Sequence, residues 1–404
     1  MLISGTDKRA LHCLLYIAVT GKASSGHQQA HFADIIKGVS MKIIEVKTYN
    51  TSYPVKAPFS NGMRTTRERA FGIVEIITDA GITGWGEGAS LPARRAIENN
   101  VVGKNPFDHE VIWSALHYAG VDAAGISAID IALWDIMGKA QQKPIYALLG
   151  GAWRQQVQAY ATGLFRRDVP DHTAALVAEA KGYADAGFKA MKMKVGFGPD
   201  YDIKNVAAVR RAIGDNILFA VDANCAYDRG SAIAVGKRMA ENNLLWFEEP
   251  IAADDVEGYL EVKRALGIRI SGAEQLRGRW AFRNVLQQRA MDIIQPDVCV
   301  CGGITEYRKI HAMASANHVR VIPHMFGTAI RLAATMHLLA TLPDQPRALE
   351  PFPVLLEYDM SENALRTELA LNPIVHKDGV VAVPQGPGLG IDINRETLNR
   401  YVVN

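Results

Sequence analysis

The sequence predicts an α/β protein built around a parallel β/α barrel, and three regularities support that prediction. Six polar residues recur in the middle of the chain at intervals of 23 to 28 residues. Such an interval fits one β-strand plus one crossover helix, the repeating unit of a parallel barrel. Each polar residue closes a short apolar run, and helical periodicity fills the intervals. The six are Lys194, Asp222, Glu248, Glu274, Asp297 and His324.

Short apolar runs between Tyr160 and about Leu369 are the predicted barrel strands. Segments such as 173–186 and 328–342, which carry helical periodicity, are the predicted helices between them. This alternation contains no dinucleotide-binding fingerprint. The eight predicted strands are YATGL (160–164), FKAMKMKV (188–195), ILFAVDA (217–223), LLWFEE (244–249), RISGAE (269–274), DIIQPDV (292–298), RVIPHM (320–325) and VLLEYD (354–359).

An initial α+β domain is predicted ahead of the barrel. Residues 41–50, 70–79 and 82–88 alternate like the strands of an antiparallel meander, and 126–142 has helical periodicity. The predicted divisions are an N-terminal extension of unknown role (1–40), the α+β domain (41–155), the barrel (156–369) and a C-terminal segment that packs back on the first domain (370–404).

Composition excludes several classes of function. The 404 residues carry 44 basic and 42 acidic side chains, and no basic run is interleaved with aromatics, so a nucleic-acid partner is not expected. No apolar stretch reaches membrane-spanning length. The four cysteines suggest no disulfide framework, and Cys299 and Cys301 are expected to be small buried residues. Asp7 interrupts the basic region of a faint signal-peptide pattern, so a cytoplasmic location is expected.

Asp222, Glu248 and Glu274 are the predicted metal ligands. Strand C-termini of a barrel converge on one face, where active sites form. Three carboxylates there would repel one another unless a cation lay between them. Oxygen-only ligands favour a hard ion, Mg²⁺ above Ca²⁺ or Mn²⁺. Solvated strand-end carboxylates are the alternative explanation for any one of the three, but not for three in register.

Two further groups of residues are the predicted catalytic bases. Lys192 and Lys194 lie two apart on a strand and so face the same side; burying the two cations together is expected to lower the pKa of each. Asp297 and His324 close neighbouring strands, and a carboxylate bonded to one imidazole nitrogen raises the basicity of the other. Glu357 on the last strand is a candidate hydrogen-bond partner for the substrate carboxylate, and Glu350 is a weaker candidate.

Lys194 and His324 would flank a substrate that lies on the metal. Two bases on opposite faces of one carbon can remove a proton and return it on either side, or one can protonate a leaving group. The metal would stabilise the enediolate that develops from the substrate carboxylate.

The chain resembles the enolase superfamily, specifically its mandelate racemase group. The matching stretches are KMKVG, VDAN, FEEP, SGAEQ, QPDVCVCGG and IPHMFGT, with SAIDIALWDIMGKA and LLGG in the first domain. The resemblance implies a modified TIM barrel, (β/α)₇β, beneath an α+β capping domain. It also implies Mg²⁺ (with Mn²⁺ as a substitute), Lys194 and His324 as bases with Lys192 and Asp297 as their partners, and Glu357 as an electrophilic helper. A Lys or His base working with Mg²⁺ on an enediolate is the known chemistry of this superfamily.

The loops of the first domain are expected to determine which substrate binds. Residues 56–64 and 87–92 are expected to close over the pocket, and Asn61, Arg64 and Asn224 are the candidate substrate-binding residues. YATGLFRRD, VGFG, CVCGG and LEYD look most like D-galactarolactone cycloisomerases, which open a sugar-diacid lactone. Alternatives are an aldarate or aldonate dehydratase, a 2-hydroxy acid racemase, and a non-catalytic sugar-acid binding protein. We expect a small carboxylate substrate and a homo-oligomer.

Overall fold

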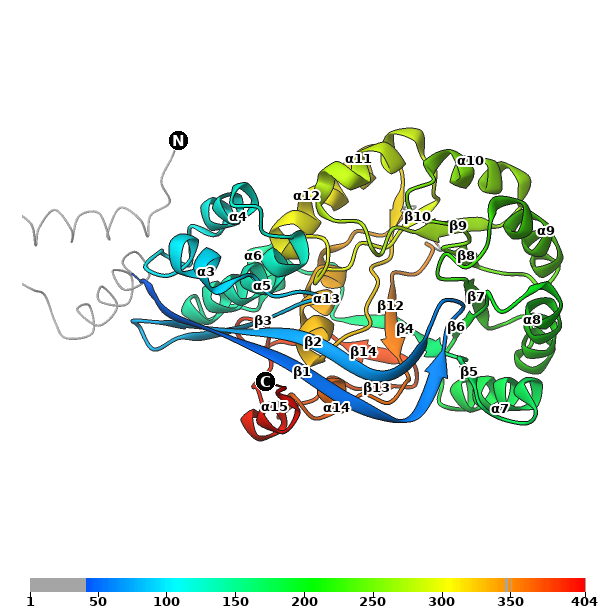
Figure 1. Ribbon diagram of the computed structural model, residues 1–404, viewed down its shortest axis with the longest axis horizontal. Coiled ribbons are helices and arrows are strands. Elements are labelled where there is room, and N and C mark those ends of the chain that lie inside the picture. Colours follow the sequence, from blue (N-terminus) through cyan, green and yellow to red (C-terminus); the bar gives the residue numbers. More distant parts are fainter. Residues whose placement is uncertain (1–40, 346–347, 350, 404) are drawn as a thin grey trace, which may run out of the picture.

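The structure is a computed structural model that describes residues 41–345, 348–349 and 351–403. The predicted N-terminal extension, residues 1–40, lies outside the described residues. Figure 1 shows helices arranged around the barrel strands, with two long strands running from the first helices toward the barrel.

The barrel follows the predicted (β/α)₇β order. Its strands pair in parallel in the order β12-β4-β6-β7-β8-β9-β10-β11, which places the last barrel strand beside the first. The strands are β4 (Gln156–Gly163), β6 (Ala190–Lys194), β7 (Leu218–Asp222), β8 (Trp246–Glu248), β9 (Arg269–Gly272), β10 (Ile293–Ile294), β11 (Arg320–Val321) and β12 (Leu355–Asp359). The helices between them are α7 (His172–Asp185), α8 (Pro199–Ile213), α9 (Arg229–Ala240), α10 (Val256–Ala265), α11 (Gly278–Gln288), α12 (Gly303–Ala316) and α13 (Ala329–Thr341).

Three of the predicted strand ends lie just beyond the strands. Lys194, Asp222 and Glu248 are terminal residues of β6, β7 and β8, whereas Glu274, Asp297 and His324 follow β9, β10 and β11 in the loops. Ala273 has a left-handed backbone, with φ of 76°, which ends β9. Asp297 and His324 each follow a proline, and a proline has no N–H for a ladder hydrogen bond. The ladders therefore stop earlier than the apolar pattern suggests.

The first domain begins with the predicted antiparallel meander. Strands β1 (Ile43–Ser60), β2 (Thr65–Thr78) and β3 (Thr83–Gly88) pair in the order β3-β2-β1, and β5 (Arg166–Arg167) joins the far end of β1. Much of the segment predicted as a loop, 56–64, is strand. The turn is short because the Asn61 side chain accepts hydrogen bonds from the backbone N–H groups of Met63 and Arg64 at 3.0 and 2.9 Å.

The hairpin β1–β2 approaches the barrel loops closely at its tip. A Cβ on Gly62 would lie 2.8 Å from the Cβ of Ala226 and 3.0 Å from the carbonyl oxygens of Ala223 and Val195. Those residues follow β7 and β6. The hairpin therefore brings the first domain against the face of the barrel where the strands end.

One helix of the first domain packs closely on its sheet because glycines of β3 face it. The helices of this domain are α3 (Arg94–Asn100), α4 (His109–Tyr118), α5 (Ala123–Ala140) and α6 (Ile145–Leu148). Gly84, Gly86 and Gly88 alternate along β3, and a Cβ on any of them would lie within 2.3 Å of a backbone oxygen of α5. The helix therefore packs directly on the backbone of β3. Residues between these glycines, including Glu87, face the other side of the strand.

The C-terminal segment contacts both parts of the chain. Helix α14 (Ala364–Thr367) precedes it, and the segment itself contains β13 (His376–Lys377), β14 (Val380–Ala382) and α15 (Arg395–Tyr401). Strand β14 pairs antiparallel with β4 of the barrel. Leu389 donates its N–H to Asp135 of α5 at 2.9 Å, and Arg395 bonds Glu75 of β2. This segment thus lies between the barrel and the first domain.

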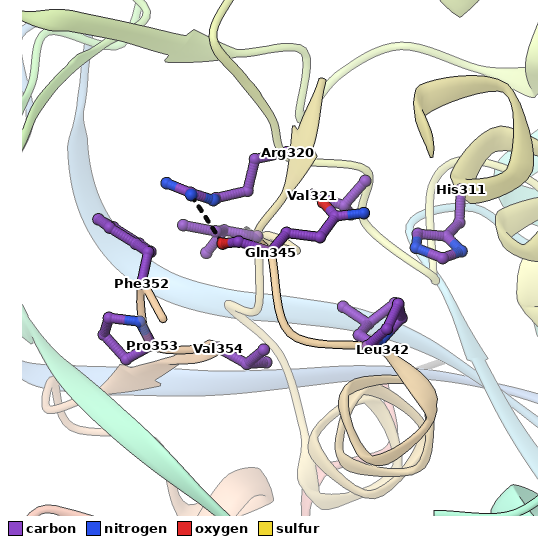
Figure 2. A pocket seen from close by; sticks show the side chains of 10 residues that line it. His311, Arg320, Val321, Leu342, Gln345, Phe352, Pro353 and Val354 are labelled. Carbon is purple, nitrogen blue, oxygen red and sulfur yellow. Dashed lines mark hydrogen bonds between the residues drawn. The ribbon is translucent and has the colours of Figure 1, made fainter. Parts of the chain in front are cut away.

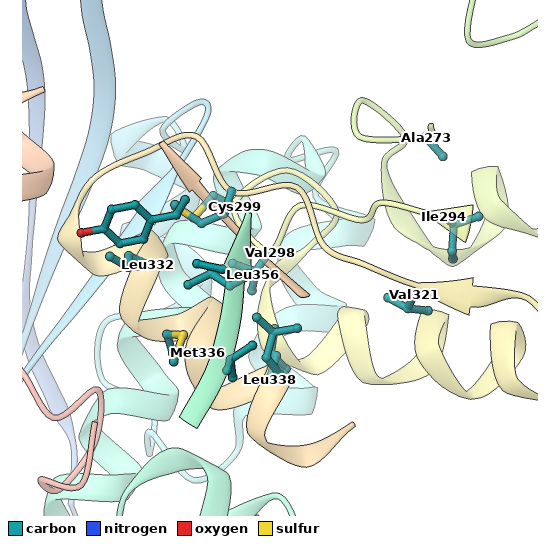
Figure 3. Close-up of a cluster of buried hydrophobic side chains, with 14 of the residues drawn as sticks. Ala273, Ile294, Val298, Cys299, Val321, Leu332, Met336, Leu338 and Leu356 are labelled. Carbon is teal, nitrogen blue, oxygen red and sulfur yellow. The ribbon is translucent and has the colours of Figure 1, made fainter. Parts of the chain in front are cut away.

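Besides a small separate cluster that includes Tyr160, Ala190 and Trp246, one large apolar core joins the barrel strands to their helices and extends under the first domain. Figure 3 shows part of it, where Leu332, Met336 and Leu338 of α13 meet Leu356 of β12 and the neighbouring Cys299. Cys299 and Cys301 are buried and unbridged, as predicted. No helix in the described part of the chain has both the length and the apolar character that a membrane span needs.

Candidate active site

Asp222, Glu248 and Glu274 come together at the mouth of the barrel. One carboxylate oxygen from each lies within 4.8 Å of the others. Asp222 and Glu248 are buried and paired across β7 and β8, and Glu274 is partly buried. Oxygens on opposite sides of a Mg²⁺ ion are about 4 Å apart, so a small adjustment would bring the three onto one cation.

Unsatisfied oxygen atoms also support a cation here. Oε2 of Glu274 and Oδ1 of Asn224 are buried and have no hydrogen-bond partner among the described residues. Buried oxygens without a donor are costly, and a metal ion or a ligand with donors would satisfy them. The donor set is oxygen only, which fits a hard divalent ion such as Mg²⁺. The residues present therefore fit the expected metal.

Lys192 and Lys194 lie among these carboxylates. The Lys192 ammonium is fully buried and contacts Glu248, Glu357 at 2.8 Å and Asp222 at 3.4 Å. Lys194 contacts Asp222 and lies at the edge of the open cavity. The expected lowering of the lysine pKa values is wrong in this arrangement. Burial lowers the pKa of Lys194, but the negative charges of Asp222, Glu274 and Glu248 together outweigh it and leave the pKa above its usual value.

Asp297 and His324 form the expected pair. Nδ1 of His324 lies 2.6 Å from Oδ2 of Asp297, and its Nε2 faces Oε2 of Glu274 at 3.5 Å. Burial lowers the pKa of His324, but the charges of Glu274 and Glu357 and the bond to Asp297 outweigh it and raise the pKa to about 10. Asp297 therefore holds one imidazole nitrogen, and the other nitrogen points toward the carboxylate cluster.

Glu357 lies on β12 inside the same cluster. It accepts hydrogen bonds from Thr162 at 2.8 Å and from the N–H of Met325 at 3.1 Å, and it pairs with Lys192. Burial raises its pKa, but the charges of Lys192 and His324 lower it to about 2. Glu357 therefore lies with the other carboxylates and both candidate bases, and its role as an electrophilic helper stays a prediction. Glu350, the weaker candidate, lies outside the described residues.

A cavity of about 540 Å³ joins the barrel mouth to the first domain. From the barrel it is lined by Lys194, Asn224, Glu274, His324 and Glu357. The hairpin β1–β2 supplies the opposite wall, including Asn61, Arg64 and Arg67, and Ala89 contributes from the loop after β3. All three candidate substrate-binding residues, Asn61, Arg64 and Asn224, thus line one space with both candidate bases.

Several residues of this region were not predicted from the sequence. Arg331 on α13 donates to Asp297 at 2.8 Å and to Glu87 of β3 at 2.8 Å. Arg69 of β2 pairs with Asp359 at 3.0 Å and lies over the ring of Phe326. One signal was available: Arg331 is a single charge within an otherwise apolar helical run, which favours a buried ion pair.

A smaller pocket lies at the opposite end of the barrel, near the start of β11 (Figure 2). Its volume is about 20 Å³. Arg320 donates to the carbonyl oxygen of Gln345 at 2.8 Å and lies 3.8 Å from the ring centre of Phe352. Arg320 already contacts the protein across this small pocket, so we assign no ligand to it.

Comparisons with known proteins agree with this geometry. Residues 43–150 match the mandelate racemase / muconate lactonizing enzyme N-terminal domain, and 175–397 match the enolase C-terminal domain-like family. The chain is 38% identical to D-galactarolactone cycloisomerase from Agrobacterium fabrum, over 89% of this chain and 99% of that protein. It is 33% identical to arabinonate dehydratase from Saccharolobus solfataricus, over 81% of this chain and 89% of the relative.

A solved structure extends the likeness to a metal-containing protein. A racemase from Streptomyces coelicolor A3(2) with bound magnesium superimposes with a TM-score of 0.78 and 29% identity, covering 89% of this chain and all of that one (100%). These relatives catalyse different reactions on one fold, so the fold alone does not select among them.

Proposed function

The chain belongs to the mandelate racemase and muconate lactonizing enzyme family, and on that premise we propose that it is a Mg²⁺-dependent enzyme that removes the proton α to the carboxylate of an acid sugar or its lactone. The proposed reaction is cycloisomerisation of a sugar-diacid lactone. The observation that carries the proposal is that a carboxylate triad and two separate base candidates share one cavity.

Each residue has a proposed role. Asp222, Glu248 and Glu274 would hold the cation, which when bound supplies positive charge beside the substrate carboxylate and stabilises the enediolate. Lys194 and His324 would stand on either side of the α-carbon. They come from β6 and the loop after β11, which are well separated around the barrel, and both line the cavity.

The proposed ring opening conserves all atoms. One base takes the α-proton, and the electrons of that C–H bond form a C=C bond as the bond from the β-carbon to the ring oxygen breaks. The released ring oxygen takes a proton from the protein, and the enol product becomes a keto acid that is an isomer of the lactone. If a free hydroxyl occupied the leaving position instead, the same steps would release water. If nothing left, return of the proton on the other face would give racemisation.

The wall formed by the hairpin favours a diacid. Arg64 and Arg67 line the cavity, and neither guanidinium has an ion-pair partner among the described residues. A carboxylate at the far end of the substrate would satisfy this charge, since guanidinium groups bind carboxylates through paired hydrogen bonds. The dehydratase proposal is kept as the second candidate because a dehydratase of a monoacid, arabinonate, is among the relatives.

The test is incubation of the purified chain with Mg²⁺ and a panel of aldaric acid lactones, free aldarates, aldonates and mandelate in D₂O. NMR would follow α-deuterium incorporation, and mass spectrometry would separate isomerisation from loss of water. We expect a diacid lactone to give an isomeric keto acid with the highest kcat/KM. Absence of both exchange and turnover across the panel would reject an enzyme of this type, and ligand binding unaffected by EDTA and by Lys194→Ala would favour the non-catalytic binding protein.

Arg64→Gln tests the diacid preference separately. It should reduce kcat/KM for a diacid lactone by about 10-fold or more, the loss of one charge-assisted hydrogen bond. The same substitution should leave a monoacid substrate nearly unaffected. Equal losses for both substrates would argue against a distal carboxylate at this wall.

A further inference from the structure

Glu87 of the first domain reaches into the barrel and is completely buried. It lies on β3 between Gly86 and Gly88, which face α5, so its side chain faces away from that helix. Its carboxylate accepts hydrogen bonds from the N–H and hydroxyl of Thr328 at 3.1 and 2.5 Å, and from the N–H of Arg331 at 3.2 Å. These groups belong to the start of α13. A carboxylate at this position also interacts favourably with the helix dipole.

A continuous series of short contacts connects Glu87 to His324. Arg331 donates from Nε to Glu87 and from Nη1 to Asp297, both at 2.8 Å. Asp297 in turn holds Nδ1 of His324 at 2.6 Å. Within this series, Glu87, Arg331 and Asp297 are buried, so each charge depends on its neighbour for compensation.

Gly327 leaves the space that the Glu87–Arg331 contact occupies. A Cβ on residue 327 would lie 2.4 Å from Nε of Arg331 and 2.5 Å from Oε1 of Glu87. Residue 327 belongs to the loop before α13. Only glycine at this position leaves room for the ion pair.

The first domain is also linked to the other oxygen of Asp297, through Cys299. The N–H of Ala89, just beyond β3, donates to the carbonyl oxygen of Cys299 at 3.0 Å. The N–H of Cys299 donates to Oδ1 of Asp297 at 2.7 Å. Both oxygens of Asp297 are thus linked to the end of β3, one through Arg331 and one through Cys299.

We infer that Glu87 is a positioning residue that, through Arg331, holds Asp297 and His324 in their working orientation. This inference rests on the proposed function, because it takes His324 as one of the two bases. The base is then complete only when the first domain is seated on the barrel. Glu87 itself touches no cavity-lining base, and it acts through Arg331.

Glu87→Gln tests the inference, with Glu75→Gln as the matched control. Glutamine keeps the shape and one acceptor oxygen of Glu87 but removes the charge that Arg331 shares. Glu75 is a buried carboxylate on β2 that also pairs with an arginine, Arg395, away from the cavity. Removal of partners that orient a functional histidine commonly costs about 10- to 100-fold in activity. We expect Glu87→Gln to lower kcat by that factor with KM changed less than about 3-fold, and Glu75→Gln to retain wild-type kcat.

A second readout does not depend on turnover. Histidine-selective ¹⁵N labelling of the full chain, with His324→Gln to assign the resonance, reports the hydrogen bond between Nδ1 of His324 and Asp297. Wild-type protein and Glu75→Gln should show one sharp His324 Nδ1–H resonance, and Glu87→Gln should shift or broaden that resonance. If Glu87→Gln does not fold, Arg331→Lys, which keeps the positive charge but not both bonds, is measured in its place.

The outcomes separate the two proposals. Wild-type protein without turnover on any acid sugar, but with the Glu87-dependent His324 resonance, rejects the proposed function and keeps the positioning role. A Glu87→Gln protein with normal kcat and an unshifted His324 resonance overturns the inference. Equal losses in Glu87→Gln and Glu75→Gln also overturn it, because they would show a general effect on the first domain.

Discussion

Replacing Gly62 by alanine tests whether the tip of the hairpin β1–β2 sets the geometry of the cavity. The added Cβ would lie 2.8 Å from the Cβ of Ala226 and 3.0 Å from the carbonyl oxygens of Ala223 and Val195. Carbon atoms in favourable contact are about 3.5 to 4.0 Å apart, so the tip must withdraw by about 0.7 to 1.2 Å. Misplacing a positioning element by about 1 Å costs up to about 10²-fold in rate, equivalent to about 2.7 kcal/mol of transition-state stabilisation.

The assay compares kcat and KM of Gly62→Ala and the wild type on the best substrate of the acid-sugar panel. Gly267→Ala is the control, since a Cβ there meets no atom within 4 Å. We expect kcat/KM of Gly62→Ala to fall by about 10²-fold, with the control unchanged. The Tm should move little because residues 61–64 are partly or fully exposed. Identical kinetics for the two variants would refute the idea that the hairpin tip holds the substrate in place.

Three further predictions concern the bases, the metal and pH. Lys194→Met and His324→Asn should each lower kcat by about 10²- to 10⁴-fold. For a given substrate stereoisomer, α-deuterium exchange should survive in only one of these two variants. Equal exchange in both variants would contradict two bases on opposite faces of the α-carbon. EDTA should abolish turnover, and Mg²⁺ at about 100 times its Kd should add about 2.7 kcal/mol to the free energy of unfolding. The metal site would be rejected if Mg²⁺ did not change the Tm of the wild type, or if it changed the Tm of Glu274→Gln equally. Burial lowers the pKa of His337 to about 4, so the unfolded chain takes up a proton first as the pH falls. The free energy of unfolding should therefore decrease between about pH 6.5 and 4, by up to about 3 kcal/mol. Urea titrations of the wild type and His337→Gln check this, and an equal slope in both would show that another group is responsible.

The barrel and its cluster of polar side chains could be predicted because a strand–helix repeat has a nearly fixed length. That length brings Asp222, Glu248 and Glu274 to one edge whatever the helices contain. The pairing of Asp297 with His324 could be predicted from the same repeat length, because adjacent strands end side by side. These predictions needed only order along the chain and the parallel sense of the strands.

Charge states could not be predicted in the same way. The closeness of Lys192 and Lys194 on one strand predicts a lowered pKa for each, but it leaves out what each ammonium touches. The structure places Lys192 against three carboxylates and Lys194 against one, and their attraction outweighs burial. A pKa depends on distances of a few ångströms between residues far apart in sequence, and no periodicity encodes them.

The ion pair between Glu87 and Arg331 could not be predicted from the sequence, for a related reason. The two residues are separated by most of the barrel sequence, and their contact depends on how β3 of the first domain is seated on α13. Glycines on one side of β3 place Glu87 on the other side, but they do not reveal its partner. Contacts between domains are set by surface shape, which a strand or helix pattern does not specify.

The proposed bases and the proposed substrate-binding residues lie on different parts of the cavity wall. This separation explains how relatives with different reactions share so much of this chain. The proposed bases, Lys194 and His324, lie at the end of β6 and in the loop after β11, whereas Asn61 and Arg64 lie on the hairpin. The α-proton becomes acidic for any carboxylate held at the triad. Which substrate oxygen then lies beside the second base depends on how the hairpin holds the other end. On the proposed function, substitutions at Asn61 and Arg64 should therefore exchange a ring oxygen for a hydroxyl as the leaving group, and so isomerisation for dehydration, while Lys194 and His324 keep their positions.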